Sequence, residues 1–551
     1  MSSRLLAIED RLAAAALLAL AACALAPRAR ARQSLAPTLI GEPIAQPGGA
    51  FGEAIVATEE VLVAGQSGAP TPWGGSVEVY QRQGPTWAHQ ASIPAPDAHS
   101  PAFGYHLGLA PSGERILVGA PTSQAGGAAL GRATVFEKVA GSWTQVAQLA
   151  PSDAGAGASA LLFGLDFACT SERTFVRAPG WGGHASPEGP GAVYVYAHDS
   201  ATAQVAEEGI VRPATFQAGL PWASSLDASG STLVVGAMHY GALQGRVHVF
   251  AHQGGAWIQV QELAPSDPSD TLFGADVALH GSRLVVGAPG TQTGAAYVYE
   301  LSEGAWVEVE RIVPSDPCAG ALFGDRVDVV GTTIAVGNGH YGSSWCGTTP
   351  YAGRVYVFDD VLGTTREIGR AEPLSLEGVG GSFGRFLALS KRSLLVGHGK
   401  FSGSCPPTSP ACAAGIVYDF RLPSLLSGPD AVTTQGGTQL LQLSAGASQS
   451  GQVHLLLGSL SGTSPGLALE GEWLPLAPDD YFAVTLTQPN SAFLPDSLGS
   501  LDAQGRAVAT FQLSSPLPSA LAGLDIAHAY VLLRPWDGKI VWASNAHLLT
   551  L

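Results

Sequence analysis

The segment from Leu272 to Asp316 reads LFGADVALHGSRLVVGAPGTQTGAAYVYELSEGAWVEVERIVPSD. It opens with Phe-Gly, and four short runs of apolar or alternating residues follow, separated by turns that contain glycine or polar residues. Runs of this length with a period of two are typical of β-strands, and glycine permits the tight turns between them. The segment therefore predicts one four-stranded antiparallel sheet.

The same unit occurs seven times. The Phe-Gly pair that opens it recurs in six units, and Trp222-Ala223 takes its place in the fourth unit; the six pairs are Phe51-Gly52, Phe103-Gly104, Phe163-Gly164, Phe273-Gly274, Phe323-Gly324 and Phe383-Gly384. The third strands read GSVEVYQ, GRATVFE, GAVYVYA, GRVHVFA, GAAYVYE, GRVYVFD and GIVYDFR. One such sheet cannot bury both faces alone, whereas radially packed sheets can. We therefore expect an all-β fold with a seven-bladed β-propeller over residues 35–422, in which the Phe packs between sheets and the Gly lets backbones approach closely.

The ring should be closed by the N-terminal strand. The seventh unit has no fourth strand of its own before Pro423, where the repeat stops. The segment LAPTLIGEPIAQPGGAFG, from Leu35 to Gly52, resembles the fourth strand and linker of other units. We expect this segment to complete the last blade.

These repeats resemble FG-GAP repeat proteins, including the propeller of integrin α-subunits. Many members of that family carry an Asp-rich calcium loop between the first two strands. Here the corresponding turns read ATEE, APSGER, ACTSER, DASGS, LHGS, VGTT and LSKRS. None offers the spaced oxygen ligands that calcium needs, so we predict no metal site and no cofactor.

Residues 424–551 form a second region. Strand-like runs occur there, separated by turns such as Asp537-Gly538; they are TQLLQLSAG, QVHLLLGSL, DYFAVTLTQ, RAVATFQLS, AHAYVLLRP and KIVWASNAHLLTL. This pattern predicts a small β-sandwich. It is similar to C-terminal modules of large exported bacterial proteins, which implies a surface-retention or sorting accessory; a capping or spacer domain is the alternative.

The first 31 residues are typical of an export signal, because Arg4 and Arg11 precede an apolar run too short to span a bilayer comfortably. Leu20-Ala21-Ala22-Cys23 resembles a lipobox, so lipid anchoring at Cys23 is the competing interpretation. We expect a bacterial extracellular or cell-surface protein with no transmembrane helix after signal removal. Export permits disulfides, for which Cys318–Cys346 and Cys405–Cys412 are the candidate pairs; Cys169 is expected to be a buried thiol.

The net charge of −17 argues against nucleic acid as a partner. We expect a monomer that binds a protein or a carbohydrate at one face of the propeller. Aromatic residues in the loops between second and third strands suit such a face. The predicted ligand-binding residues are Trp73, Trp181, His239, Tyr240, His340, Tyr341, Trp345 and Phe401.

No nucleophile elbow, zinc-protease motif, Walker loop or dinucleotide-binding glycine pattern is present in the sequence. We interpret the chain as a secreted or cell-surface binding or adhesion module and not as an enzyme. Two alternatives remain. One is a hydrolase or lyase with its site in the central channel, and the other is a structural surface protein without a specific ligand.

Overall fold

The fold is described here from a computed structural model. It describes residues 37–41, 51–67, 74–83, 86–97, 100, 102–123, 130–153, 161–179, 191–199, 204–214, 222–241, 243–290, 293–316, 321–338, 353–361, 364–372, 383–390, 393–398, 415–421, 425–427, 436–445, 449–462, 467–469, 472–474, 476–503, 505–513, 524–544 and 547–550. The predicted export signal lies outside these residues. The chain divides into two units, one comprising residues 34–359 and 369–420 and the other centred on residues 421–551. Among the described residues, no helix has the length and apolar character needed to cross a bilayer.

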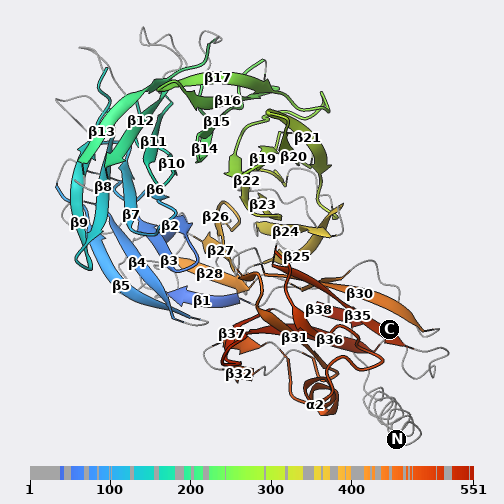
Figure 1. The fold of residues 1–551 in the computed structure, drawn as a ribbon. Coiled ribbons are helices and arrows are strands. Elements are labelled where there is room, and N and C mark those ends of the chain that lie inside the picture. Colours follow the sequence, from blue (N-terminus) through green and yellow to red (C-terminus); the bar gives the residue numbers. More distant parts are fainter. Residues whose placement is uncertain are drawn as a thin grey trace, which may run out of the picture. The chain divides into compact units, whose positions relative to one another are not determined.

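The described part of the first unit contains seven four-stranded antiparallel sheets (Figure 1). Sheet 1 consists of β2 (Phe51–Ala57), β3 (Val61–Gln66), β4 (Ser76–Gln83) and β5 (Thr86–Pro94). Sheet 2 consists of β6 (His106–Leu109), β7 (Arg115–Ala120), β8 (Arg132–Val139) and β9 (Ser142–Leu149). Sheet 3 consists of β10 (Phe167–Cys169), β11 (Arg173–Ala178), β12 (Ala192–Asp199) and β13 (Gln204–Val211). Sheet 4 consists of β14 (Ser225–Ser229), β15 (Thr232–Ala237), β16 (Arg246–Gln253) and β17 (Ala256–Leu263).

The remaining three sheets follow the same plan. Sheet 5 consists of β18 (Val277–His280), β19 (Arg283–Ala288), β20 (Ala295–Ser302) and β21 (Ala305–Ile312). Sheet 6 consists of β22 (Arg326–Val330), β23 (Thr333–Asn338), β24 (Arg354–Val361) and β25 (Thr364–Ala371). Sheet 7 consists of β26 (Phe386–Leu389), β27 (Ser393–His398), β28 (Ile416–Arg421) and β1 (Pro37–Gly41), in the order β1-β28-β27-β26. The first strand of the chain thus pairs antiparallel with the last strand of the repeat region, with Leu39 opposite Tyr418.

Burial within a sheet follows the position of the strand. In sheet 5, the second strand β19 is buried almost throughout, whereas the fourth strand β21 alternates between exposed and covered side chains. The middle strands are covered by neighbouring sheets on both faces, and only the outermost strand has a face in water. The first strands line the middle of the unit and the fourth strands lie outside (Figure 1).

The Phe-Gly pairs form the junctions between sheets. Phe273 is fully buried and packs edge-on against Tyr297, with ring centroids 5.4 Å apart. Gly274 has φ +84°, and its carbonyl lies so close to Gly236 of sheet 4 that a Cβ there would come within 2.1 Å of the oxygen. A side chain at Gly236 is therefore sterically excluded.

The first strands contact one another in sequence around the unit. These contacts join β2 to β6, β6 to β10, β10 to β14, β14 to β18, β18 to β22, β22 to β26, and β26 back to β2. The glycine contact also returns to the beginning, because Gly397 of sheet 7 meets the carbonyl of Gly52 in sheet 1. The first unit is therefore a closed ring of sheets.

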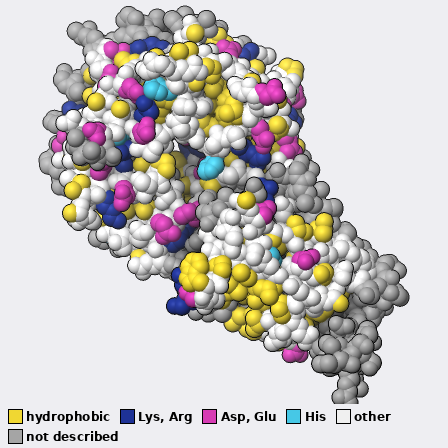
Figure 2. Space-filling model, viewed as in Figure 1, with side chains coloured by type: hydrophobic (Ala, Val, Ile, Leu, Met, Phe, Trp, Pro, Cys, Tyr) yellow, Lys and Arg dark blue, Asp and Glu magenta, His cyan; other side chains and the backbone are white. Residues whose placement is uncertain are grey.

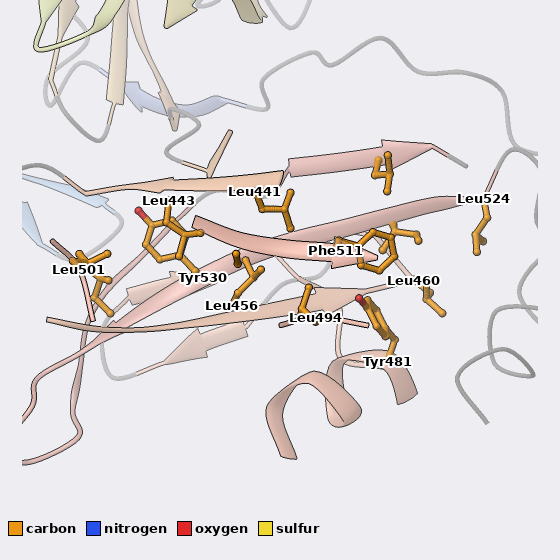
Figure 3. Close-up of a cluster of buried hydrophobic side chains, with 14 residues drawn as sticks. Leu441, Leu443, Leu456, Leu460, Tyr481, Leu494, Leu501, Phe511, Leu524 and Tyr530 are labelled. Carbon is orange, nitrogen blue, oxygen red and sulfur yellow. The ribbon is translucent and has the colours of Figure 1, made fainter. Parts of the chain in front are cut away.

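The second unit is built from further antiparallel strands and one described helix. The first sheet consists of β29 (Leu425–Ser427), β30 (Gly437–Ser444) and β35 (Arg506–Leu513), and the second of β34 (Leu498–Ser500), β31 (Val453–Ser459), β36 (Asp525–Leu533), β37 (Ile540–Ala543) and β38 (His547–Thr550). A small hairpin pairs β32 (Leu467–Leu469) with β33 (Glu472–Leu474). Buried side chains of both sheets form one cluster, which includes Leu441, Phe511, Leu456 and Tyr530 (Figure 3).

The alternating run DYFAVTLTQ predicts a strand, and this prediction is wrong: α2 (Asp480–Thr487) is a helix. Asp479 is its N-cap, and its carboxylate accepts hydrogen bonds from Phe482 N at 2.8 Å and Leu460 N at 2.7 Å. A capping carboxylate satisfies amide groups that the first turn leaves free, and this outweighs the preference of Tyr, Phe and Val for strands.

Candidate functional site

Most of the predicted ligand-binding residues lie outside the described residues. These are Trp73, Trp181, His340, Tyr341, Trp345 and Phe401, and the candidate disulfide residues Cys318, Cys346, Cys405 and Cys412 lie there too. His239 and Tyr240 are described. Cys169 lies on β10 as a free thiol, and burial raises its pKa to about 12.

His239 and Tyr240 occupy the turn that follows β15. The Tyr240 ring is half-buried against the apolar cluster of sheets 3 and 4, 6.0 Å from the ring of His248 and edge-on to it. The guanidinium carbon of Arg246 lies 6.0 Å from the centroid of the Tyr240 ring, at the outer limit of a cation–π contact. The structure thus places Tyr240 partly against its own sheet and partly in solvent.

Charged residues that the sequence analysis did not single out gather where the first strands line the middle of the ring. Figure 2 shows histidine and basic side chains beside a narrow hollow in this region. One group consists of carboxylates, and Asp227 on β14 is representative. It accepts hydrogen bonds from Ala228 N at 2.7 Å and, across the junction, from Leu279 N of β18 at 2.6 Å.

The same arrangement recurs at neighbouring junctions. Asp328 on β22 accepts from Val329 N at 2.7 Å and from Leu389 N of β26 at 2.6 Å. Asp276 accepts from Val327 N of β22 at 2.9 Å. First strands are edge strands with unpaired amide groups, and these carboxylates satisfy such groups from the next sheet. They therefore tie successive sheets together along the axis.

Burial raises the pKa of these carboxyl groups: Asp227 to about 8, Asp276 to about 7 and Asp328 to about 6, while the amide hydrogen bonds act in the opposite direction. The pKa of Asp166, which directly precedes β10, is also raised by burial. Burial therefore moves the titration of these carboxyl groups, which line the middle of the ring (the channel), toward neutral pH.

Replacing Asp227 should change how stability depends on pH. The ordinary pKa of the group is 3.8, and its pKa in the folded protein is about 8. Between these values the folded state holds a proton that the unfolded chain has lost, so this group makes stability fall as pH rises through that range, with no further change above it. Asp227→Asn removes this titration. The free energy of unfolding should be measured with urea at pH 5, 6.5 and 8. Relative to the wild type, that of the variant should increase with pH by on the order of 1 kcal/mol per pH unit. A difference that is constant with pH contradicts the raised pKa.

The second group in the channel is basic and surrounds His106, the first residue of β6. Burial lowers the pKa of His106 well below its ordinary value, and the charges of Arg177, Arg326 and Arg385 lower it further. Arg177 lies on β11, Arg326 begins β22 and Arg385 directly precedes β26. The arginines of three sheets therefore act electrostatically on His106, which belongs to a fourth sheet.

One Ser-His-Glu cluster in sheet 1 has the residue types of a hydrolytic triad. Glu78 Oε2 lies 2.9 Å from His89 Nε2 and accepts from Ser92 Oγ at 2.5 Å, and Ser92 Oγ lies 3.3 Å from the same Nε2. A triad needs the acid on one ring nitrogen and the nucleophile on the other, so that the ring can pass a proton. Here both contacts involve Nε2, and Ser92 already donates to the acid. The cluster is therefore a hydrogen-bond network between strands and lacks triad geometry.

A groove of about 440 Å³ lies at the junction of sheets 1 and 2, away from the channel. Its lining includes Trp143, Phe136, Lys138 and Gln81. Within the part of the chain that the structure describes, no group of three or more His, Cys, Asp or Glu side chains is arranged to hold a metal ion.

Sequence reasoning missed the channel residues, although the repeat alignment contains a signal for one of them. The second strands carry a glycine at the junction with the next sheet; Gly65, Gly119, Gly236, Gly287, Gly337 and Gly397 occupy this position. Sheet 3 has Arg177 there, and the opening pair of sheet 4 is the aberrant Trp222-Ala223. Both departures fall at one junction, which marks it as different from the others.

Solved structures that match this chain share little of its sequence. A candidate 6-phosphogluconolactonase of Bacteroides uniformis is 10% identical, with a TM-score of 0.41, and the match covers 61% of this chain and 88% of that one. The periplasmic gluconolactonase PpgL of Pseudomonas aeruginosa is 14% identical, with a TM-score of 0.38 and coverage of 70% and 92%. Sqt1 of Saccharomyces cerevisiae is 11% identical, with a TM-score of 0.38 and coverage of 71% and 100%. Likeness at this level carries no argument about what this chain does.

No curated protein matches the chain. The family model of the FG-GAP repeat matches residues 257–299 and 306–358, which contain strands of sheets 4, 5 and 6. The opening Phe-Gly pairs Phe273-Gly274 and Phe323-Gly324 fall within these two matches. This agrees with the repeat found in the sequence: the chain contains FG-GAP repeats within residues 257–358.

Proposed function

We propose that this chain is a seven-bladed β-propeller over residues 35–422, followed by a small β-sandwich over residues 424–551, and that it binds a protein or carbohydrate ligand outside the bacterial cell. In this proposal residues 1–31 direct export, the mature protein is a secreted or surface-attached monomer, and the sandwich retains it at the surface or caps the propeller. The closed contacts among the seven sheets and the shared core of the two C-terminal sheets support this architecture.

The observation that favours binding over catalysis is the state of the channel carboxylates. Asp227 and Asp328 each accept two backbone hydrogen bonds of 2.6–2.7 Å. A general acid or base must be able to exchange a proton with a substrate atom within hydrogen-bond reach. Both oxygens of each carboxyl group are already engaged with amides that hold the ring together, so these groups serve the fold.

A channel-centred hydrolase or lyase is the second candidate, and the raised pKa values favour it. A glycosidase needs one protonated and one ionised carboxyl group, and Asp227 and Asp328 have pKa values of about 8 and about 6. Release of reducing sugar from a polysaccharide panel, lost in Asp227→Asn while folding is kept, would establish this candidate in place of the first.

The binding proposal is tested with a glycan array and a protein pull-down on the mature chain. The paired substitution Tyr341→Ala, Trp345→Ala should weaken binding by about 2 kcal/mol per side chain, the usual contribution of an interface hot spot. Trp536→Ala is the matched control, because Trp536 belongs to the C-terminal unit and is 75% exposed. If the paired variant binds as well as the wild type, the predicted aromatic face is wrong. If the wild type retains no ligand, a structural role replaces the proposal.

A further inference from the structure

The basic group around His106 is drawn from four sheets. His106 belongs to sheet 2, Arg177 to sheet 3, Arg326 to sheet 6 and Arg385 to the start of sheet 7. Arg326 Nε donates to the carbonyl of Arg385 at 2.9 Å, which joins the last two. The charges of all three arginines act on the one imidazole. Residues far apart in the sequence therefore lie within electrostatic reach of one another, near the starts of the first strands.

The arginines keep hydrogen-bonding capacity. Arg177 Nη1 lies 3.6 Å from Asp166 Oδ2, and Arg326 Nη1 lies 3.7 Å from Asp276 Oδ1, so neither ion pair is a hydrogen bond. Arg177 Nε is buried and has no acceptor among the described residues. A guanidinium carries five N–H groups, and the side chains of Arg177 and Arg326 remain 15% and 33% exposed. Donors are thus available to a molecule that enters the channel.

Several of the nearby carboxylates are held by the backbone, while Asp325 acts on Arg326 and Glu53 on Arg385. Asp276 accepts from Val327 N at 2.9 Å, and Asp166 accepts from Phe167 N at 2.9 Å. Asp227 and Asp328 lie further along their strands and accept two amides each. Burial also raises the pKa of these groups, which reduces their negative charge near neutral pH. Wherever these carboxyl groups hold a proton, they do not compensate the arginine charges.

Arg177 occupies a place where the repeat demands a small residue. At the six other junctions this position is glycine, and a Cβ there would come within 2.1 Å of the carbonyl oxygen of the next sheet's opening glycine. At the Arg177 junction the opening pair is Trp222-Ala223, and Ala223 takes φ +60°. One junction is thus rebuilt around a guanidinium that reaches the channel. Packing alone does not require this change, because glycine suffices at the other junctions.

We propose that His106, Arg177, Arg326 and Arg385 form a binding site for a small oxyanion, that is, a phosphate, sulfate or carboxylate group. Planar guanidinium groups match the two oxygens of such a group, and enclosure strengthens the charge-assisted hydrogen bonds. The neutral imidazole of His106 offers one further N–H. This site lies in the channel and does not depend on the aromatic loops proposed above. Its three arginines gather positive charge in a chain whose net charge is −17, so an anion is attracted to this place and not to the chain as a whole.

The test is calorimetric titration of the full mature chain at low ionic strength with inorganic phosphate, sulfate, glucuronate and glucose, since salt screens such contacts. Phosphate, sulfate or glucuronate should bind saturably, whereas glucose, the uncharged counterpart of glucuronate, should not. Preference for glucuronate identifies a carboxylate site, and preference for phosphate or sulfate identifies an ester group of the ligand. Arg385→Gln should weaken the affinity for the preferred anion about tenfold, which is the effect of losing one hydrogen bond to a charged group.

Arg534→Gln is the control, because it removes the same charge from a partly exposed pair with Asp537 in the C-terminal unit. It should leave anion affinity unchanged. As a second measurement, the pKa of His106 in the wild type, followed by NMR, should rise when phosphate binds, and this holds even if Arg385→Gln fails to fold. The site is ruled out if no anion binds saturably, or if glucose binds as well as glucuronate. It is also ruled out if both variants lose the same anion affinity, or if phosphate leaves the pKa of His106 unchanged.

Discussion

Replacing Asp419 with alanine should destabilise the ring of sheets by about 3–5 kcal/mol, because it removes Asp419 as a buried counter-ion of the Arg82 guanidinium. Asp419 on β28 and Arg82 on β4 lie at the junction of sheets 7 and 1, with side chains that are each 1% exposed and an N–O distance of 3.9 Å. Trp87 Nε1 donates to Asp419 at 3.0 Å, and the Arg82 guanidinium lies 4.1 Å from the centroid of the Trp87 ring. This network joins the first and last sheets, so its loss acts where the ring closes.

Urea unfolding followed by tryptophan fluorescence measures the effect. The repeat itself supplies the rescue: six of the seven third strands have valine where Asp419 stands, and the fifth unit has Leu301 where Arg82 stands. The double variant Arg82→Leu, Asp419→Val should recover most of the lost stability, because apolar side chains often replace a buried ion pair at no net cost. Asp537→Ala, at a surface pair, should cost about 0–1 kcal/mol. If Asp419→Ala costs no more than Asp537→Ala, the network does not stabilise the closure.

The repeat could be read from sequence because each of its signals has a local physical cause. Period-two runs such as AAYVYEL give strands, and the turn glycines Gly281 and Gly304 take φ +61° and +85°, as tight turns require. The buried anchor Phe273 was expected from its recurrence, and FG-GAP repeats are confirmed in this segment. Asp419 could also have been noticed in the sequence. The other six third strands have valine at this position, and an Asp in a buried strand implies a partner.

The channel could not be assembled in the same way. His106 and Arg326 belong to sheets 2 and 6, and only the closed ring brings their charges together. The role of Asp227 depends on its reaching Leu279 N, a tertiary contact between strands that do not pair as neighbours in a sheet. For α2, a local signal was misleading: the alternation of apolar residues predicted a strand. The segment is a helix because Asp479 caps it, and the same carboxylate accepts from Leu460 N just after β31.

Gly397→Ala should be among the most destabilising single-methyl changes in the chain, at about 3 kcal/mol, the upper end for overpacking a core. A Cβ at Gly397 would lie 2.1 Å from the carbonyl oxygen of Gly52, 3.1 Å from its carbonyl carbon and 3.2 Å from Phe386 Cβ. The nearest atoms belong to backbone and cannot rotate away, so sheets 7 and 1 must separate at the closing junction. Buried Phe51 and Val417 pack in the same cluster and would lose contact as the sheets part.

The matched control is Gly209→Ala in β13, where no heavy atom lies within 4 Å of the added Cβ. That change should be neutral or stabilising by a few tenths of a kcal/mol up to about 1 kcal/mol, since alanine restricts the unfolded chain. Thermal and urea unfolding of the two variants beside the wild type therefore compare the same methyl group at a closed junction and at an open site. Equal midpoints for the two variants would mean that sheets 7 and 1 do not meet at Gly397 and Gly52, and that the ring is not closed through that contact.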